Sequence, residues 1–508
     1  MPRISKIPQS PLVGCGKLEN REMEKLSHTT PFTLSRNIGW RLLFSLVLLC
    51  LAFAPSGVSY AIQEEPQGPV YIVQEGDTLW DIAARFGVSV DELQRVNGMS
   101  DPGLLKVGDR LVIPGLEGIQ GVIVTQEVPF GETTRSLSRK YMLPEEILAR
   151  LNRLTSPAEL FAGSTLIIPE MSGGLPSTRR SSLNPGQSLL ELAASEGVNP
   201  WALVDGNVLL GSWAALPGEI LRTPGEGDAG PGALPPEIQS ISVEPLALRQ
   251  GKAAEIAVAS TQDLTLGGSL IDNQLNFFPD PEQGYVALQG MHAMTEAGIY
   301  PLTLSGTLPS GAPFTFTQMV PVKEVGYPYD QPLTVNPTTI DPSVTRPEDA
   351  QWTALAVPVT PDQYWSGIFK LPSPLDADYC LETGDCWSSR FGNRRSYNGS
   401  AYSYFHTGLD VVGRTGTEIY APADGVVVFT GPLTVRGNAT MIDHGRGVYT
   451  GYMHQSEILV QPGERVKAGQ LIGRVGGTGR VQGPHLHWEV WVGGVQVDPL
   501  DWLRQAYP

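Results

Sequence analysis

An internal repeat constrains the fold of this chain more than any other feature of its sequence. Three anchor residues, a glycine, an asparagine and a proline, recur twice at a constant interval of 55 residues. Three anchors that keep one period across three copies indicate a single supersecondary unit used three times. A chain of 508 residues is also too long for one hydrophobic core, so a modular architecture is expected. The three anchor sets are Gly76, Asn97 and Pro114, then Gly131, Asn152 and Pro169, then Gly186, Asn207 and Pro224.

Each copy has the pattern of a small βααβ unit. In the first copy a short β-rich stretch leads to Gly-Asp-Thr, and Thr78 can cap a helix whose apolar residues recur near helical spacing. Ser188 takes the capping position in the third copy. A second short helix is expected to end near Asn97, and the segment RLVIP that follows reads as a strand.

The first copy, residues 69–115, resembles the LysM domain over nearly its whole length, through EGDTLWDIAARFGVSVDELQRVNG and VGDRLVIP. The second copy, residues 121–170, is also similar to that family, and the third, residues 179–225, is similar more weakly. The resemblance implies binding to the N-acetylglucosamine backbone of peptidoglycan or chitin. A scaffold copy with reduced sugar binding is expected for the third repeat, and the alternative for all three is a spacer role.

The N-terminal segment, residues 1–61, is expected to be a secretory signal peptide. The apolar run LLFSLVLLCLAFA follows Arg36 and Arg41 and precedes small residues that end at Ala61. The run is shorter than the roughly 20 apolar residues of a spanning helix, so an uncleaved anchor is the alternative, and only then is a membrane contact expected. The sequence thus predicts an extracellular or cell-envelope protein. A net charge of −17 argues against a nucleic acid as its partner.

Cysteine usage agrees with export. The segment that follows the signal keeps only Cys380 and Cys386, in YCLETGDC. A nearby pair in an oxidising compartment is most simply a disulfide that closes a small loop. Half of a zinc site is the alternative, but the chain has no second pair of cysteines to complete one.

The middle of the chain changes character twice. Residues 226–237 are rich in Gly and Pro and read as a linker. Residues 238–325 contain short alternating segments between Gly and Pro turns, which predict an immunoglobulin-like β-sandwich spacer. The lone His292 in this spacer is expected to be structural or solvated. Residues 326–388 read as an irregular, Pro-rich connector that the disulfide would pin.

The candidate chemistry lies near the C-terminus, where five of the seven histidines follow residue 400. His485 and His487 lie in GPHLHWEV, and as alternate residues of a strand they project to one side, with Leu486 and Trp488 on the other. The segment FHTGLDVV adds a histidine and an aspartate. A catalytic zinc site keeps three protein ligands and one open position, and one histidine of the H-x-H pair would complete that set with His406 and Asp410.

Residues 389–503, within a predicted peptidase domain that spans residues 389–508, resemble the lysostaphin/LytM-type zinc endopeptidases of peptidoglycan. The similarity runs through HTGLDVVGRTGTEIYAPADGVVV, IDHGRGVYTGYMHQS and GERVKAGQLIGRVGGTGRVQGPHLHWEVWV. It implies one Zn²⁺ per chain held by His406, Asp410 and His487, and catalytic roles for His454 and His485. By the same resemblance His444 is structural, and Glu489 is not assigned as a base. The fold expected here is mainly β.

The combined reading is an exported zinc metalloendopeptidase that cuts peptide cross-links of the bacterial cell wall. LysM repeats would hold it on the glycan, and the stem or cross-bridge peptide would lie at the zinc site, where His454 and His485 act on the water and the leaving amine. The alternative is a non-catalytic wall-binding protein or an activator of other cell-wall hydrolases. One departure from the family is Gln455, which follows His454 where a leucine is common; it is not a ligand, so activity is still expected.

Overall fold

The computed structural model describes residues 68–508 except 117–118, 120 and 171–174. The expected signal peptide, residues 1–61, lies outside these described residues. Within the described ranges, no helix combines the length and the apolar character that crossing a membrane requires.

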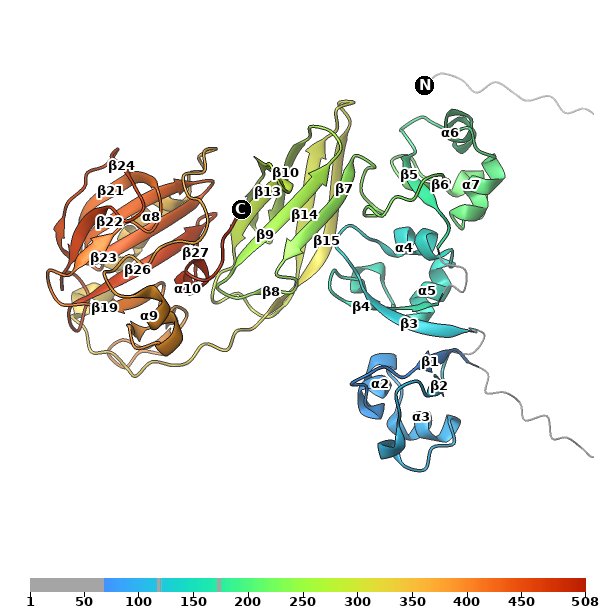
Figure 1. Ribbon diagram of the computed structural model, residues 1–508, viewed down its shortest axis with the longest axis horizontal. Helices are drawn as coiled ribbons and strands as arrows, with labels where there is room; N and C mark the ends of the chain where they lie inside the picture. The colour runs from blue at the N-terminus through green and yellow to red at the C-terminus, as the bar shows by residue number, and fades with distance from the viewer. Residues whose placement is uncertain (1–67, 117–118, 120, 171–174) are drawn as a thin grey trace, which may run out of the picture. The chain divides into compact units, whose positions relative to one another are not determined.

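Each of the three repeats forms two short strands and two short helices (Figure 1). A single 3-10 turn precedes the last strand of each copy. These turns are Pro102–Leu104, Pro157–Glu159 and Ser212–Ala214. Strand β1 pairs with β3 in parallel, so the strands of the first two copies form one sheet in the order β2-β1-β3-β4, whereas β5 and β6 pair by themselves. The elements of the first copy are β1 (Val70–Ile72), α2 (Leu79–Phe86), α3 (Val90–Val96) and β2 (Arg110–Val112); of the second, β3 (Val122–Glu127), α4 (Thr134–Tyr141), α5 (Glu145–Leu151) and β4 (Thr165–Pro169); of the third, β5 (Thr178–Ser182), α6 (Leu189–Glu196), α7 (Pro200–Gly206) and β6 (Ile220–Pro224).

The repeated residues have structural roles that explain their spacing. The Asn97 side chain donates to the carbonyls of Leu93 and Val112 and accepts from the Val112 N–H, which ties the second helix to the last strand. The asparagines of the other two copies make the same three bonds. Gly76 has a φ of 86°, a backbone conformation that favours glycine. Thr78 caps α2 by accepting from the Asp81 N–H, as predicted, and Ser188 caps α6 in the same way.

Residues 238–323 form two sheets around a shared core. One has the strand order β11-β10-β14-β15-β8 and the other β12-β13-β9-β7. The all-β prediction is confirmed for this segment, and its immunoglobulin-like character stays a prediction. The strands are β7 (Ile238–Glu244), β8 (Leu248–Arg249), β9 (Ala253–Ser260), β10 (Thr265–Leu270), β11 (Asn273–Asn276), β12 (Phe278–Asp280), β13 (Gly284–Gly290), β14 (Gly298–Thr307) and β15 (Pro313–Lys323).

The prediction of an irregular connector over 326–388 is wrong for three helical stretches. Residues Pro337–Ile340 form a 3-10 turn, and Pro342–Ala356 form the 15-residue helix α8. Asp341 caps α8, and Pro342 occupies its first turn, where a missing N–H costs nothing. Helix α9 (Ala377–Thr383) follows, and the predicted disulfide between Cys380 and Cys386 is present, with a Cα–Cα distance of 5.2 Å.

The C-terminal segment is built on one large antiparallel sheet. Its central strand order is β16-β19-β26-β23-β22-β21-β24, with β20, β25 and β27 attached to it. The mainly β prediction is therefore confirmed. The elements are β16 (Trp387–Ser389), β17 (Arg394–Arg395), β18 (Tyr404–Phe405), β19 (Leu409–Val412), β20 (Glu418–Tyr420), β21 (Gly425–Leu433), β22 (Gly437–Gly445), β23 (Val448–Ile458), β24 (Arg465–Val466), β25 (Leu471–Val475), β26 (His485–Val492), β27 (Val495–Val497) and α10 (Pro499–Trp502).

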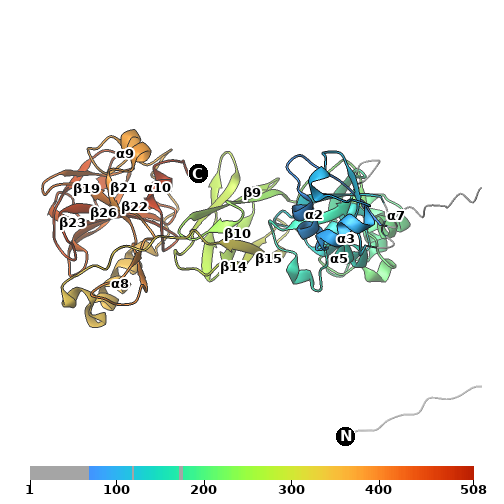
Figure 2. The same cartoon turned by 90° about the horizontal axis from the view of Figure 1, so that it is seen from below.

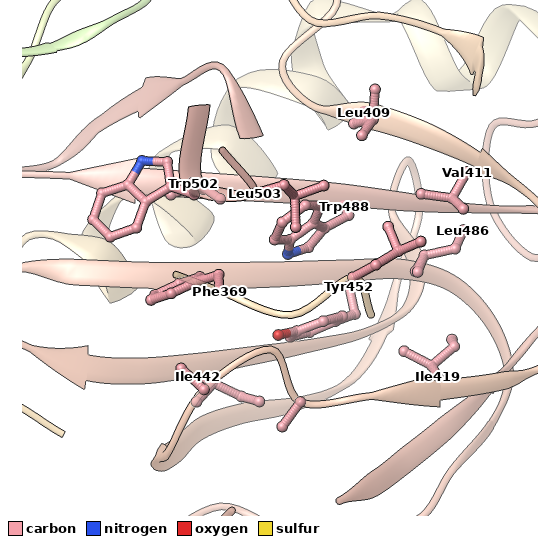
Figure 3. Close-up of a cluster of buried hydrophobic side chains, with 14 of the residues drawn as sticks. Phe369, Leu409, Val411, Ile419, Ile442, Tyr452, Leu486, Trp488, Trp502 and Leu503 are labelled. Carbon is pink, nitrogen blue, oxygen red and sulfur yellow. The ribbon is translucent and has the colours of Figure 1, made fainter. Parts of the chain in front are cut away.

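The two faces of this sheet have different partners. Leu486 and Trp488 point from β26 into the larger core, together with Tyr452 of β23 (Figure 3). The opposite face carries a smaller cluster that includes Trp352 of α8 and Trp491 of β26. Helices α9 and α8 consequently lie on opposite sides of the sheet (Figure 2). Strand alternation thus separates an apolar face, whose burial contributes roughly 1.5–3 kcal/mol per large side chain, from the face that carries the histidines.

Candidate metal centre and active site

Three side chains converge on the α8 side of the sheet. His406 Nε2, Asp410 Oδ1 and His487 Nδ1 lie 2.8 to 2.9 Å from one another. All three residues are almost fully buried. Asp410 lies on β19 directly opposite His487 on β26, and His406 follows β18. Residues that are far apart in the sequence are therefore brought together by strand pairing.

The second nitrogen of each imidazole has a partner that fixes its proton. His406 Nδ1 lies 2.9 Å from the carbonyl oxygen of Arg390, and His487 Nε2 lies 3.3 Å from Oε1 of Glu489. Each of these nitrogens donates its N–H to the oxygen, so in the neutral ring the lone pair is on the nitrogen that faces Asp410. A histidine that binds a metal through one nitrogen usually donates the other to a carbonyl or a carboxylate in this way.

The convergence of these three atoms suits a metal ion. Two imidazole lone pairs and a carboxylate oxygen repel one another at this distance unless a proton or a cation lies between them. Nitrogen and oxygen donors are the ligands that Zn²⁺ takes, and three of them leave a fourth position for water or substrate. No other group of three or more His, Cys, Asp or Glu side chains in the described ranges comes together in this way. The residues present therefore fit a metal centre.

Arg395 supports the carboxylate from the other side. Its Nη2 donates to Oδ2 of Asp410 at 3.1 Å, and its Nε lies 3.4 Å from Oδ2 of Asp330. The guanidinium is mostly buried, where an ion pair is screened less than on the surface. Asp410 is thus held in one orientation, with Oδ1 toward the two imidazoles.

His454 and His485 lie beside the three converging residues, and their ring centroids are 5.0 Å apart. The Nδ1 atoms of His454 and His485 donate to the carbonyls of Thr478 and Gly483, at 2.8 and 2.9 Å, which leaves the lone pair of each neutral ring on Nε2. His485 Nε2 is 3.5 Å from Asp410 Oδ1. All four histidines predicted from the sequence are thus brought together around Asp410.

The backbone at His454 is unusual. Its φ is 63°, a left-handed conformation that side-chain-bearing residues rarely adopt. The pairing of β22 with β23 shifts its register at this point, which is the mark of a β-bulge. The His454 N–H donates to the Arg436 carbonyl at 2.9 Å. Strained backbone of this kind concentrates at functional sites, where the surroundings hold it in place.

A groove passes over these histidines. Two hollows of about 280 and 390 Å³ share five of their lining residues, so they are the two halves of one depression. The first half reaches Trp491 and Gln496, and the second reaches Asp330 and Gly483. A depression that extends to both sides of the candidate centre suits an extended chain. The shared lining residues are Arg395, Tyr397, His454, Arg480 and His487.

Burial and neighbouring charges set the protonation of the site. Burial lowers the pKa of His406 to about 4 and that of His454 to about 3, so both rings are neutral at pH 7. Burial opposes the charge of Asp410, but His406 and His487 outweigh it and hold the pKa of this carboxyl well below its usual range. Burial likewise opposes the charge of His487, while its hydrogen bonds to Asp410 and Glu489 raise its pKa. A bound cation would displace that proton.

Sequence reasoning missed the partners of these residues. The sequence assigns Glu489 no role as a base, and it indicates no role for Arg395 or for the side chains of α8. Arg395 lies 15 positions from Asp410, and Trp352 of α8 lies 137 positions from its partner Glu489, so no local pattern connects them. The pair Asp341-Pro342, which is typical of a helix start, is the local signal that could have indicated α8. His444 has both ring nitrogens bonded, to the Asp424 carbonyl and the Thr450 hydroxyl, which supports a structural role.

Comparison with known families agrees with this geometry. Residues 404–499 match the family model described as Peptidase family M23. Residues 71–114 and 127–169 match the LysM domain, which corresponds to the first two repeats. The chain therefore carries LysM repeats and an M23 peptidase domain, as the sequence predicted.

Curated relatives are similar over part of the chain. Peptidoglycan DD-endopeptidase ShyC of Vibrio cholerae is 45% identical over 112 residues, which are 22% of this chain and 26% of the relative. Peptidoglycan DD-endopeptidase ShyA of the same organism is 43% identical over 113 residues, again 22% and 26% of the two chains. The chain thus matches about a quarter of the length of these relatives. The solved structure of lysostaphin from Staphylococcus simulans is 34% identical over 20% of this chain and 44% of that one, with a TM-score of 0.19.

Proposed function

We propose that this protein is a zinc-dependent endopeptidase that hydrolyses peptide cross-links of peptidoglycan. The observation that carries the proposal is the buried convergence of His406, Asp410 and His487 in a groove that also holds His454 and His485. The similar Vibrio cholerae proteins are peptidoglycan DD-endopeptidases. A bond between two D-configured residues is accordingly the proposed point of cleavage.

His406, Asp410 and His487 are the proposed ligands of one Zn²⁺. Bound zinc would supply Lewis-acid activation of water and of the scissile carbonyl. Arg395 keeps Asp410 in place, and Glu489 fixes the proton on the far nitrogen of His487. These contacts leave three lone pairs directed at one point without rearrangement of the side chains.

His454 and His485 are the proposed catalytic residues. Each ring holds its own proton on Nδ1 and presents Nε2 as an acceptor. The low pKa of His454 keeps it neutral at pH 7, so it can accept a hydrogen bond from the attacking water and orient it. His485 is the more exposed of the two and lies next to Asp410. It is placed to take up a proton and return it to the leaving amine.

The N-terminal repeats are the proposed glycan anchor. LysM repeats 1 and 2, over residues 69–115 and 121–170, would bind N-acetylglucosamine units and raise the local concentration of cross-links at the groove. The third repeat, residues 179–225, is the proposed scaffold copy. We further propose that residues 226–237 are a linker, that residues 238–325 are an immunoglobulin-like spacer and that residues 389–508 are the peptidase domain. Residues 1–61 are the proposed signal that exports the protein to the cell envelope.

Release of soluble muropeptides from purified cell wall tests the proposal. Wild-type protein should release cross-link-cleaved fragments that mass spectrometry identifies, and EDTA or His487→Ala should stop the release. Added zinc should restore the chelated wild type but not the variant. Zinc binding without any release would leave a wall-binding or activator protein as the function.

A further inference from the structure

Helix α8 lies outside the segment that matches Peptidase family M23, yet two of its buried polar side chains face the candidate site. Glu348 and Trp352 are one helical turn apart, with exposed fractions of 7% and 0%, and therefore share a helix face. Neither is buried among apolar groups alone. Each makes hydrogen bonds that lead to one of the proposed functional histidines.

The Trp352 indole reaches the metal ligand His487 through Glu489. Its Nε1 donates to Oε2 of Glu489 at 2.9 Å, while Oε1 of the same carboxylate accepts from His487 Nε2 at 3.3 Å. Trp491 Nε1 donates to Oε2 at 2.8 Å, and the Thr407 hydroxyl donates to Oε1 at 2.6 Å. The carboxylate plane is thus fixed by donors on both oxygens, and through it the ring of His487 is fixed.

The Glu348 carboxylate reaches the catalytic candidate His454 by a different route. It accepts from the backbone N–H groups of Thr434, Val435 and Arg436, at 2.7 to 3.1 Å. This turn ends with the Arg436 carbonyl, which accepts the N–H of His454 at 2.9 Å. Because His454 has a φ of 63°, its backbone depends on such contacts to stay in the left-handed region.

The two routes meet at Arg436. Its guanidinium carbon lies 5.4 Å from the centre of the Trp352 ring, and its Nη1 is 3.1 Å from Oε1 of Glu348. Asp349 of the same helix pairs with Nη2 at 2.9 Å. One helix therefore holds both sides of the site from a single packed face.

We propose that α8 is a positioning element of the active site, in which Trp352 sets the metal ligand His487 through Glu489 and Glu348 sets the catalytic His454 through the turn at 434–436. The second half of this inference rests on the proposed function, because it concerns turnover. The first half concerns metal affinity alone, so it rests on the proposed zinc ligands but not on the proposed peptidase activity.

The competing role for α8 is packing. Trp352 belongs to the small apolar cluster with Ala356, Met441 and Tyr449, and loss of packing alone would lower stability without separating metal binding from turnover. Trp352→Phe keeps an aromatic ring in this cluster and removes only the donor. Glu348→Gln keeps the shape and removes the charge. Gln351→Ala, on the exposed side of the same helix, is the matched control.

The test uses the full chain and three measurements: the zinc Kd by chelator competition, kcat and KM on a cross-linked muropeptide dimer at saturating zinc, and the melting temperature. Trp352→Phe should raise the zinc Kd about tenfold, because loss of a partner of a metal-bound histidine typically weakens metal binding about 10- to 100-fold. The kcat of this variant at saturating zinc should stay within about twofold of the wild-type value. Glu348→Gln should leave the zinc Kd within about twofold and lower kcat about tenfold or more with little change in KM. Gln351→Ala should change neither quantity.

A double variant checks the route through Glu489. If Trp352 acts through this carboxylate, Trp352→Phe should add almost nothing to the zinc Kd once Glu489→Gln is present. Glu348→Asp, which keeps the charge, replaces Glu348→Gln should the latter fail to fold, and a shift confined to kcat is again expected. Equal changes of zinc Kd and kcat in the α8 variants, or a fall in melting temperature alone, would overturn the proposal. Wild type that binds zinc and cleaves nothing would instead defeat the proposed function and leave the zinc comparison intact.

Discussion

Asp410 lies directly opposite His487 in the antiparallel pairing of β19 with β26, and its Oδ1 is 2.8 Å from Nδ1 of that histidine. Two of the three proposed ligands are therefore a cross-strand pair, whose separation is set by backbone hydrogen bonds. Their neighbour His485 is two residues from His487 on the same strand face, and the roles of the two histidines can be separated by experiment.

His487→Ala should lose zinc and activity together, whereas His485→Ala should keep zinc and lose turnover. Removing a general acid or base costs roughly 10²- to 10⁴-fold in rate, and His485 is not among the three converging donors. Bound zinc measured by mass spectrometry, beside muropeptide release, gives both quantities. If His485→Ala also sheds the metal, His485 is a ligand and the division of roles is wrong.

Arg395→Met should weaken zinc binding about 10- to 100-fold, the usual effect of losing a group that orients a ligand. The variant leaves Asp410 Oδ2 without the Arg395 charge that now lies 3.1 Å away. The carboxylate then turns more freely. It also binds a proton more readily, and this proton competes with zinc. Arg395→Lys should recover part of the affinity. Arg414→Met removes the same charge from an exposed position and should leave the zinc Kd as in wild type; an equal loss there would indicate a general electrostatic effect.

His444 should make metal-free protein less stable as the pH falls from about 6.5 to about 4. Burial lowers its pKa to about 4 in the fold, so over this window the unfolded chain binds a proton that the native chain does not, and stability rises with pH. One such histidine accounts for about 3 kcal/mol across the window.

His444→Gln should flatten this dependence by about one proton while muropeptide release stays near the wild-type rate, since its ring bonds only Asp424 and Thr450. Hydrogen exchange of β22 and β23 in EDTA, measured between pH 4.5 and 7, follows the stability of this domain alone. An unchanged slope would show that other groups carry the pH dependence.

Asn97→Ala should loosen the first repeat by about 2–3 kcal/mol, because three hydrogen bonds worth roughly 0.5–1.5 kcal/mol each are lost. The amide of Val112, which now donates to the Asn97 side chain at 2.7 Å, should exchange faster by a corresponding factor. Asn207→Ala should do the same to the third repeat and leave Val112 protected, so each variant serves as the control for the other. Protection that survives in Asn97→Ala would contradict the role assigned to the repeated asparagine.

The repeats and the histidine site could be predicted because their signals are local. Gly76 and Asn97 recur since one backbone conformation and one side-chain clamp recur, and a constant period makes that visible. His485 and His487 alternate with Leu486 and Trp488, so the strand period alone predicts that the two pairs face opposite sides. The paired cysteines 380 and 386 were equally local.

The support around the site could not be predicted because it depends on contacts between distant segments. Glu348 and Trp352 lie in a stretch with several prolines, which reads as irregular, and the packing of Trp352 against the sheet offsets the hydrogen bond lost at Pro347 inside α8. Arg395 belongs to a two-residue strand with no periodicity to interpret. The link between β1 and β3 across two repeats is likewise a tertiary pairing without a sequence pattern.

The alternation of apolar and polar side chains along β26 also favours one register of this strand against β19. A slip of one residue against β19 would turn Leu486 and Trp488 toward the groove and drive His485, His487 and Glu489 into the apolar core, where unpaired polar groups are costly. A mispaired chain would therefore lose both the packing of its core and the convergence of the candidate site residues. Only molecules with the correct register would therefore be both stable and able to carry out the proposed reaction.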